Sequence, residues 1–397
     1  MTYKCNICLS HDVLSLLSLP SFPLNSQYFP NKNLKSTNYF KDYYLYYCSN
    51  CYHIFGKSDF KLTELYNDEY NYRPSSPNIY SRVNFISSQL EKLKNISFNR
   101  VIDIGCYNGQ LLKKVKSFLT ADYFIGIDPS LPVELLAENN EFLFIKDFIQ
   151  NIDLPYYNEK KPDLILSDQC FEHIEDLNLV LSKLYDNVSF DSKFYICVPS
   201  IEAMIDKLNF QFLIHEHLNY FSVKSLNKLF FNHSLFIESY SIDYESTSNY
   251  LFSIFRKSRV ELFCNDNIDS PIITNELFLK QFNNFKNNLE INGDLIYRIK
   301  NNYEIFGFGA SDLTSNLAYF MNTDFKYLIN ILDDTTWKDN LFLLGIDSKI
   351  LNPNDFNIDY YKQCFCLITA PQATRHLLNR VNTLSFKSIL LPTGTLI

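Results

Sequence analysis

Hydrophobic and polar positions divide the chain into regions with different periods. Between residues 98 and 260, short β-branched apolar runs alternate with amphipathic stretches, and this pattern predicts a parallel α/β sheet. The runs expected as strands are RVIDIG, YFIGID, FLFIKD, DLILSD and KFYICVP. Just before them, residues 75–97 carry apolar side chains three and four positions apart, which predicts a helix.

A second α/β pattern begins at residue 303. Its expected strands are YEIFGFGA, YLINILDD, CFCLITA and SILLPTG, which predict a second, smaller Rossmann-like unit. Residues 270–300 form a long helical pattern without caps and are expected to connect the two units. The start of the chain shows two cysteine pairs and little helical period. We therefore expect three domains, over residues 1–70, 71–265 and 266–397.

Composition limits the class of protein. Hydrophobic residues make up 46% of the 397 residues and charged residues 20%, which predicts a globular protein. Thirty-six basic against 44 acidic residues give a net charge of −8, which argues against a nucleic-acid partner. The sequence contains no apolar run of about 18 residues, so we expect no membrane span. The opening MTYKCNICLS lacks a basic region followed by an apolar one, so we expect no signal peptide, a cytoplasmic location and reduced thiols.

Two CxxC pairs stand near the start of the chain. Cys5 and Cys8 are separated by 39 residues from Cys48 and Cys51. Four thiolates suit tetrahedral Zn²⁺ and leave no open coordination position, so we expect a structural zinc ion. The alternatives are two disulfides or unrelated thiols, and His53 is close enough in sequence to compete as a ligand.

A glycine loop follows the first strand of the central region. VIDIGCYNGQLL contains Gly105 and Gly109, which allow the backbone to approach a ligand closely. The spacing is not the G-x-G-x-x-G of nicotinamide sites, and Asp103 in front of the loop suits a cationic amino group better than a phosphate. This is the pattern of S-adenosylmethionine (SAM) sites, in which Asn108 would belong to the same loop.

Acidic and polar residues at later strand ends extend this expected SAM site. Asp128 lies 19 residues after Gly109 and could bind both ribose hydroxyls, while Asp147 could accept from an adenine amino group. Gln169 would lie at the carboxyl end of the fourth strand. In the following FEHIEDL, Glu172 and His173 could belong to the site or be structural polar groups.

The segment LIHEHLNYFS concentrates ionisable groups among apolar residues. His215, Glu216 and His217 are costly to bury without a partner or a function. We weigh acid–base chemistry, metal binding and a hydrogen-bonded loop. Metal binding by the two histidines is the poor alternative, since no third ligand stands nearby in the sequence.

Taken together, these motifs resemble the SAM-dependent C-methyltransferases that act on nucleotide-linked 4-keto sugars in deoxysugar biosynthesis. The resemblance covers nearly the whole chain. It rests on CNIC and CSNC, LYNDEYNYRPSS, VIDIGCYNGQLL, FEHIEDL, CVPSIEAM, IHEHLNYFS, GFGAS and LDDTTWKDNLFLLG. It implies an α/β fold with a zinc-binding N-terminal segment, a SAM methyltransferase core and a C-terminal Rossmann-like domain for the nucleotide sugar.

The resemblance also implies roles for single residues. His217 matches the base that removes a proton beside the ketone, Glu216 would orient it or the sugar, and Tyr72 matches a phenol near the sugar. His215 is placed with this catalytic group. The residues expected to contact substrate are Tyr220, Gly309, Ser311, Asp333 and Lys338. We expect a monomer with no membrane partner.

Two positions depart from the family pattern. The family usually has Tyr directly before His-Glu-His, where this chain has Ile214, and Leu313 replaces an Arg of the second glycine loop. Two alternatives therefore stay open: an O-methyltransferase on the same scaffold, with His217 deprotonating a hydroxyl, and a non-catalytic protein that binds SAM or a nucleotide sugar.

Overall fold

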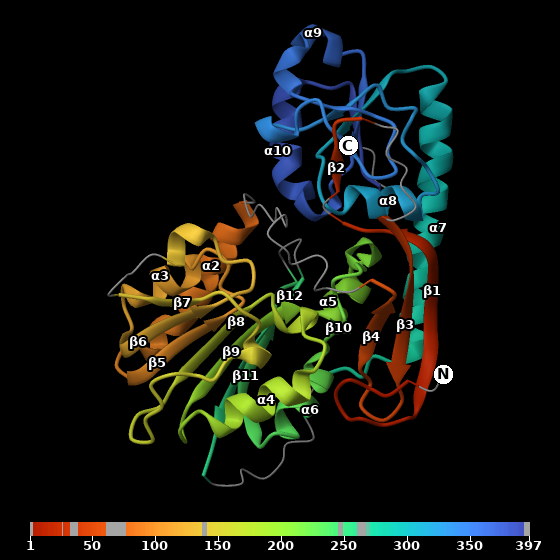
Figure 1. The fold of residues 1–397 in the computed structure, drawn as a ribbon. Coiled ribbons are helices and arrows are strands. Elements are labelled where there is room, and N and C mark those ends of the chain that lie inside the picture. Colours follow the sequence, from red (N-terminus) through yellow and green to blue (C-terminus); the bar gives the residue numbers. More distant parts are fainter. Residues whose placement is uncertain are drawn as a thin grey trace.

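A seven-stranded sheet forms the centre of the computed structural model, which describes residues 3–25, 27–31, 39–60, 77–136, 141–244, 249–259, 268 and 270–392. Its strand order is β11-β12-β9-β8-β5-β6-β7 (Figure 1). The strands are β5 (Ser97–Ile104), β6 (Thr120–Ile127), β7 (Leu143–Ile145), β8 (Leu164–Asp168), β9 (Lys193–Pro199), β11 (Leu235–Ile242) and β12 (Tyr250–Lys257).

The five apolar runs expected as strands form the parallel part of this sheet, from β5 to β9. The predicted parallel arrangement is confirmed for these five strands, and β12, which was not among the predicted strands, runs antiparallel to both β9 and β11. Strands β11 and β12 are consecutive and pair directly as antiparallel neighbours, whereas parallel neighbours require a crossover. After β7 the chain crosses to the other side of β5 and forms β8, so the strand order reverses between β5 and β8. The glycine loop follows β5 and Gln169 follows β8, both at the carboxyl ends of these strands.

Helices cover both faces of the central sheet, and alternate residues of β5 pack against each layer. Val101 packs in a cluster with residues of α2 and α3, whereas Ile102 packs with residues of α4 and α6. The expected helix over residues 75–97 is shorter, and it ends in a 3₁₀ turn at Glu91–Leu93. The helices of this unit are α2 (Pro77–Leu90), α3 (Gln110–Lys116), α4 (Leu177–Asp186), α5 (Ile201–Asp206) and α6 (Val223–Phe231).

The start of the chain forms an antiparallel sheet in the order β1-β3-β4-β10. Its strands are β1 (Val13–Pro23), β3 (Phe40–Cys48), β4 (Ile54–Ser58) and β10 (Asn219–Tyr220). Strand β10 comes directly after the His-Glu-His sequence, so the N-terminal sheet includes part of the segment expected to be catalytic.

The C-terminal unit is a five-stranded parallel sheet in the order β16-β14-β13-β17-β18. Its strands are β13 (Ile305–Phe308), β14 (Ile331–Leu332), β16 (Ile350–Leu351), β17 (Phe365–Ile368) and β18 (Ser388–Leu390). Its helices are α8 (Thr314–Phe320), α9 (Ile358–Tyr361) and α10 (Thr374–Leu384). A short pair, β2 (Tyr28–Phe29) with β15 (Phe342–Leu343), joins the N-terminal segment to this unit.

Helix α7 (Asn275–Lys300) runs between the C-terminal unit and the N-terminal sheet (Figure 1). It is capped, contrary to expectation, because the Thr274 side chain accepts a hydrogen bond from the Leu277 N–H. Its buried residues belong to one hydrophobic cluster that also contains Phe22 and Phe210 from the other two regions. No helix in the described part of the chain combines the length and apolarity that crossing a membrane requires.

Candidate active site and cysteine cluster

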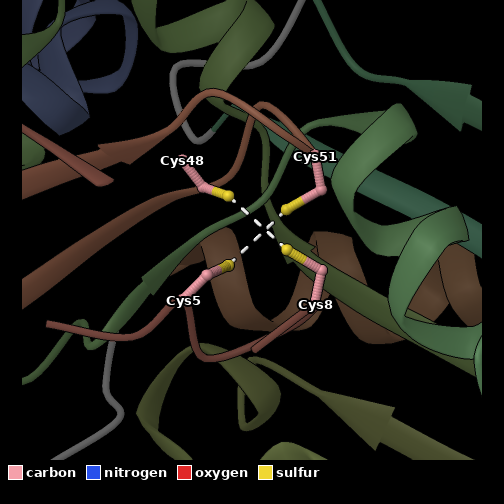
Figure 2. Close-up of side chains that lie close together, drawn as sticks. All are labelled: Cys5, Cys8, Cys48 and Cys51. Carbon is pink, nitrogen blue, oxygen red and sulfur yellow. Dashed lines mark hydrogen bonds between the residues drawn. The ribbon is translucent and has the colours of Figure 1, made fainter. Parts of the chain in front are cut away.

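The four cysteine sulfurs point toward one another, with the first pair before β1 and Cys48 at the end of β3 (Figure 2). The Cys5 and Cys51 sulfurs are 3.5 Å apart, as are those of Cys8 and Cys48, and all four lie within 4.8 Å of one another. A tetrahedral zinc ion with Zn–S bonds of about 2.3 Å separates its sulfurs by roughly 3.8 Å. The residues therefore fit such an ion. His53 is not part of this group, because its Nε2 lies 3.2 Å from the Asn219 Oδ1.

The glycine loop lies at the carboxyl end of β5 and takes a conformation that favours glycine. Gly105 and Gly109 have φ of 78° and 68°, and Gly109 precedes α3. A Cβ at Gly105 would lie 2.6 Å from the Cβ of Cys170, and one at Gly109 would lie 2.7 Å from the Phe144 ring. The loop is thus packed closely against the ends of β7 and β8. Asn108 accepts from the Gln110 N–H at 3.2 Å and shapes the turn.

Two carboxylates at this edge differ in their partners. Asp128 Oδ2 accepts from the Tyr107 N–H at 2.9 Å, and its Oδ1 accepts from the Ser130 N–H at 2.7 Å. Asp103 is buried, and within the described residues neither of its side-chain oxygens has a hydrogen-bond partner. Burial raises the pKa of Asp103 well above its usual value, and the nearby charges of Asp168 and Asp128 add to this effect. A cationic amino group beside Asp103 would satisfy it.

The other residues expected around SAM lie at the same edge of the sheet. Gln169 follows β8 with a left-handed φ of 56°, a strained conformation for a residue other than glycine. Its N–H donates to the Cys197 carbonyl at 2.8 Å. The Asp147 Oδ1 accepts from the Phe148 N–H at 2.7 Å and from the Asn151 Nδ2 at 2.8 Å, so this carboxylate shapes its own turn.

Hydrogen bonds fix the backbone of the His-Glu-His turn. The Tyr43 hydroxyl donates to the His217 carbonyl at 2.7 Å and lies 2.9 Å from the Tyr220 hydroxyl. The Tyr220 hydroxyl also accepts from the Ile214 N–H at 3.2 Å. Beyond the turn, Ser222 caps α6 in a capping box with Ser225. The segment is therefore held at both ends, and Tyr220, expected to contact substrate, here supports the turn.

The two histidines of the turn point to different surroundings. His215 Nδ1 lies 2.9 Å from the Ser58 Oγ, and its Nε2 lies 3.1 Å from the Phe22 carbonyl. His215 thus faces the N-terminal sheet, and the structure does not bring its ring together with that of His217. The ring nitrogens of His217, by contrast, have no hydrogen-bond partner among the described residues. Burial lowers the pKa of His217 well below its usual value, and the neighbouring His173 lowers it further.

Residues of the 3₁₀ turn Phe171–His173 complete the surroundings of His217. The His173 Nδ1 lies 2.8 Å from the Glu216 carbonyl, and its ring centroid lies 5.0 Å from that of His217. Neither Glu172 side-chain oxygen has a hydrogen-bond partner among the described residues. Burial raises the pKa of Glu172 to about 8 and that of Glu216 to about 7.

These side chains permit two kinds of chemistry. A neutral imidazole next to buried acids can accept a proton. The ligand atoms of Glu172, His173 and His217 also lie within 4.8 Å of one another and could hold a metal ion. Any metal here would use His173 instead of His215, a grouping that spacing within LIHEHLNYFS does not indicate. Glu172 and His173 were visible in FEHIEDL, but their contact with His217 depends on the tertiary fold.

The second glycine loop, at the end of β13, gathers the residues expected to bind the nucleotide sugar. The Asp333 Oδ2 accepts from the Ala310 N–H at 2.8 Å and pairs with the Lys338 Nζ at 3.3 Å. Gly309 has φ of 94°, and the Ser311 N–H donates to the Thr314 Oγ1 at 2.9 Å. These four expected residues therefore do lie around one loop.

Two residues that sequence reasoning missed link this loop to other regions. The Tyr28 hydroxyl lies 3.2 Å from the Ala310 carbonyl and 3.3 Å from the Asp312 Oδ1. Asn316 on α8 donates its Nδ2 to the carbonyls of Gln211 and Leu213, at 3.1 and 2.8 Å. The charge of Asp312 also contributes to the raised pKa of Glu216, after burial. The C-terminal unit thus contacts the segment that leads into the His-Glu-His turn.

Tyr72, expected as a phenol near the sugar, lies outside the described residues.

Comparison with known proteins identifies the central unit. Residues 79–235, from α2 to the first residue of β11, match the sequence model of a methyltransferase domain family. The chain is also 36% identical over 72 residues to the C-methyltransferase NovU of Streptomyces niveus. That alignment covers 18% of this chain and 17% of the relative. Both matches support a methyltransferase domain in the central unit.

Solved structures with a similar arrangement were also found. One is the 1,6-didemethyltoxoflavin-N1-methyltransferase of Burkholderia thailandensis, with 14% identity, a TM-score of 0.40 and coverage of 52% of this chain and 96% of that one. Another is the N-methyltransferase NodS of Bradyrhizobium japonicum WM9, with 11% identity, a TM-score of 0.36 and coverage of 47% and 100%.

Proposed function

We propose that this protein is a SAM-dependent C-methyltransferase that acts on a nucleotide-linked keto sugar in deoxysugar or surface-polysaccharide biosynthesis. The observation that carries the proposal is the state of His217. Its imidazole is buried, burial and then the neighbouring His173 lower its pKa, and its ring nitrogens have no hydrogen-bond partner among the described residues. It lies within residues 79–235, which match the methyltransferase domain model, and close to two acids of raised pKa.

The proposal assigns SAM to the cradle formed by the glycine loop and the ends of β5 and β6. When bound, SAM supplies an electrophilic methyl group whose bond to sulfur breaks as the new bond to carbon forms. Asp103 would pair with the amino group, since its buried carboxylate has no other partner among the described residues. Asp128 would hold the ribose, with Asn108, Asp147 and Gln169 around the remainder.

In this proposal His217 removes the proton from the sugar carbon beside the ketone. The electron pair left on that carbon forms the new bond to the methyl group, and His217 returns its proton to solvent. Glu216 orients the base or the sugar. Because the pKa of Glu172 is raised to about 8, a protonated form is available near neutral pH, and it would donate a hydrogen bond to the enolate oxygen. Such a donor would offset the absence of the family Arg at Leu313.

We assign the nucleotide part of the substrate to the second glycine loop. The Lys338 ammonium lies 2.7 Å from the Ala310 carbonyl at this loop and offers a positive charge to a diphosphate. Trp337, the one tryptophan of the chain, contacts Tyr28 with ring centroids 5.0 Å apart. We therefore expect its fluorescence to change when a nucleotide sugar binds. The proposal also includes a monomeric protein in the cytoplasm with domains over residues 1–70, 71–265 and 266–397.

The experiment is incubation with methyl-labelled SAM and a panel of nucleotide-linked keto sugars, analysed by mass spectrometry and NMR. We expect label on a carbon of the sugar. Label on oxygen would instead support an O-methyltransferase. Binding of SAM and of a nucleotide sugar, measured by calorimetry, without any product would support the non-catalytic alternative.

A further inference from the structure

Asn219, two residues after His217, joins three distant parts of the chain through one side-chain amide. It is 1% exposed. Its Oδ1 lies 3.2 Å from the Asn6 Nδ2 and 3.2 Å from the His53 Nε2. Its Nδ2 donates to the Ile174 carbonyl at 2.8 Å. These three bonds all join the amide to groups far away in sequence.

The acceptor end of this amide contacts the first cysteine knuckle, residues 5–8, and a histidine just after the second knuckle, residues 48–51. Asn6 lies between Cys5 and Cys8, and His53 follows Cys51 by two residues. The two donors converge on one oxygen only while both knuckles keep their relative position. The four sulfurs fit a zinc ion that would fix that position. The hydrogen bonds of Asn219 to Asn6 and His53 therefore depend on whether the two knuckles are held together.

The donor end of the amide contacts the residues around His217. Ile174 directly follows His173, whose Nδ1 lies 2.8 Å from the Glu216 carbonyl. A second hydrogen bond joins the same two segments, because the Leu218 N–H donates to the Glu172 carbonyl at 2.8 Å. The amide thus fastens the knuckles to the two segments that place Glu172, His173 and His217 side by side.

The backbone around Asn219 allows little freedom for the turn to move independently. Asn219 pairs with Phe55 in the sheet, and the Gly56 N–H donates to the Leu218 carbonyl at 3.0 Å. A Cβ at Gly56 would lie 2.8 Å from the His217 carbonyl oxygen and 2.1 Å from the Tyr43 hydroxyl. The turn therefore rests directly on the strand that follows the second knuckle.

We propose that Asn219 is a positioning residue through which the two cysteine knuckles hold the His-Glu-His turn in its catalytic arrangement. The zinc site then supports catalysis as well as folding, although the metal touches no reacting atom. The catalytic part of this inference rests on the proposed function. The mechanical part, that knuckle geometry controls the order of the turn, does not.

The test compares Asn219→Leu with Asn178→Leu in the full-length, zinc-loaded protein. Asn178 is a matched control, because its Nδ2 also donates to the first knuckle, at the Asn6 carbonyl, while its Oδ1 lies 3.0 Å from the His233 Nε2 and not at the His-Glu-His turn. Zinc content, SAM affinity, turnover and hydrogen exchange of a peptide over residues 213–222 are measured for each. A second variant, Asn6→Ala, removes one bond to Asn219 Oδ1 and is the milder change if Asn219→Leu folds poorly.

We expect Asn219→Leu to keep its zinc and its SAM affinity, to exchange faster over residues 213–222 and to lose about 100-fold in turnover, as small displacements of catalytic groups do. Asn178→Leu should match the wild type in exchange and turnover. Removing zinc from the wild type with a chelator should accelerate exchange of the same peptide, and should add little in Asn219→Leu. Asn6→Ala should shift exchange in the same direction by a smaller factor.

The inference is overturned if exchange over residues 213–222 is unchanged in both Asn219→Leu and Asn6→Ala with zinc bound. It is also overturned if zinc removal accelerates exchange equally in Asn219→Leu and the wild type, because the coupling would then bypass the amide. If no keto sugar is methylated by the wild type, the proposed function fails, while the exchange experiment still decides whether Asn219 couples the knuckles to the turn.

Discussion

At the scale of single residues, the proposal depends on His217 as a base. General bases contribute about 10²–10⁴-fold to rate. His217→Asn should therefore lower turnover by roughly that factor, abolish exchange of the sugar's alpha proton with deuterium, and leave SAM affinity nearly unchanged. The exposed His376 on α10 gives the control, since His376→Asn should alter none of these. Wild-type proton exchange in His217→Asn would exclude His217 as the base.

The buried carboxyl of Glu172 predicts a pH-dependent stability difference. Its pKa is raised by burial to about 8, above the value near 4.3 expected in the unfolded chain. Its contribution to stability is therefore fully present below the unfolded pKa and is lost as pH rises towards 8. Glu172→Gln, which cannot ionise, should match the wild type near pH 4 and exceed it by a few kcal/mol at pH 8.

Denaturant unfolding at several pH values measures this difference. Glu290→Gln on the exposed face of α7 is the control for the amide substitution itself. A Glu172→Gln difference that stays constant with pH would mean that the pKa of Glu172 is the same in the folded and unfolded protein, against the effect of burial.

At the scale of elements, β6 carries an acid at each end, and these acids should behave differently. Asp128 at the carboxyl end is 9% exposed and lies in the cradle proposed to bind SAM, whereas Asp122 at the other end is exposed. Asp128→Ala should weaken SAM binding by about 1–3 kcal/mol, the cost of leaving partners unpaired. Asp122→Ala should not. Equal SAM affinities of the two variants in calorimetry would place the cofactor elsewhere.

The cysteine knuckles should bind one zinc ion per chain. Cys48→Ser should lower zinc content and solubility together, because the metal stabilises a segment with little core of its own. Cys366→Ser, at a thiol equally buried in β17, is the control and should keep the full zinc complement. A full complement in Cys48→Ser would contradict the assignment. A second equivalent lost in His173→Ala would indicate metal at Glu172, His173 and His217.

Elements with a strong local period could be predicted from the sequence, and contacts between them could not. The apolar runs that form β5 and β9 are bounded in the sequence, since Gly105 follows the first and Pro199 ends the second. The pairing of Asn219 with Phe55 joins segments more than 160 residues apart, and no local pattern encodes it. The same limit applies to β11 and β12, whose antiparallel pairing depends on how the chain returns to the sheet.

The candidate site shows this limit at finer resolution. The composition of LIHEHLNYFS indicated chemistry, but alternate residues of an irregular turn need not share a face. His215 faces Ser58, while His217 meets His173. The Tyr43 hydroxyl that holds the turn comes from a tyrosine-rich strand in which no residue stands out by sequence. Tyr43 differs from the other tyrosines of β3 only through its place in the folded sheet, where β3 pairs with β4.

At the scale of the whole molecule, the three predicted domains share one hydrophobic cluster. Phe22 of the N-terminal sheet, Phe210 before the His-Glu-His turn and Phe282 of α7 all belong to it, together with buried residues of the C-terminal sheet. Phe210 and Phe282 have ring centroids 5.3 Å apart. Separate folding units would each need a closed core, and here part of the core is common to all three.

We therefore expect the chain to unfold in one transition. Zinc release reports on the N-terminal cysteine pairs, and the fluorescence of Trp337 reports on the C-terminal unit, so the two probes follow two different regions that contribute to the cluster. Their midpoints should coincide in denaturant. Phe282→Ala should lower both midpoints together, by about 3–5 kcal/mol in stability, because it opens a cavity in the shared core. Phe231→Ala, at a half-buried position on α6 outside the cluster, should change both much less. Two separated transitions would show that the units are stable alone.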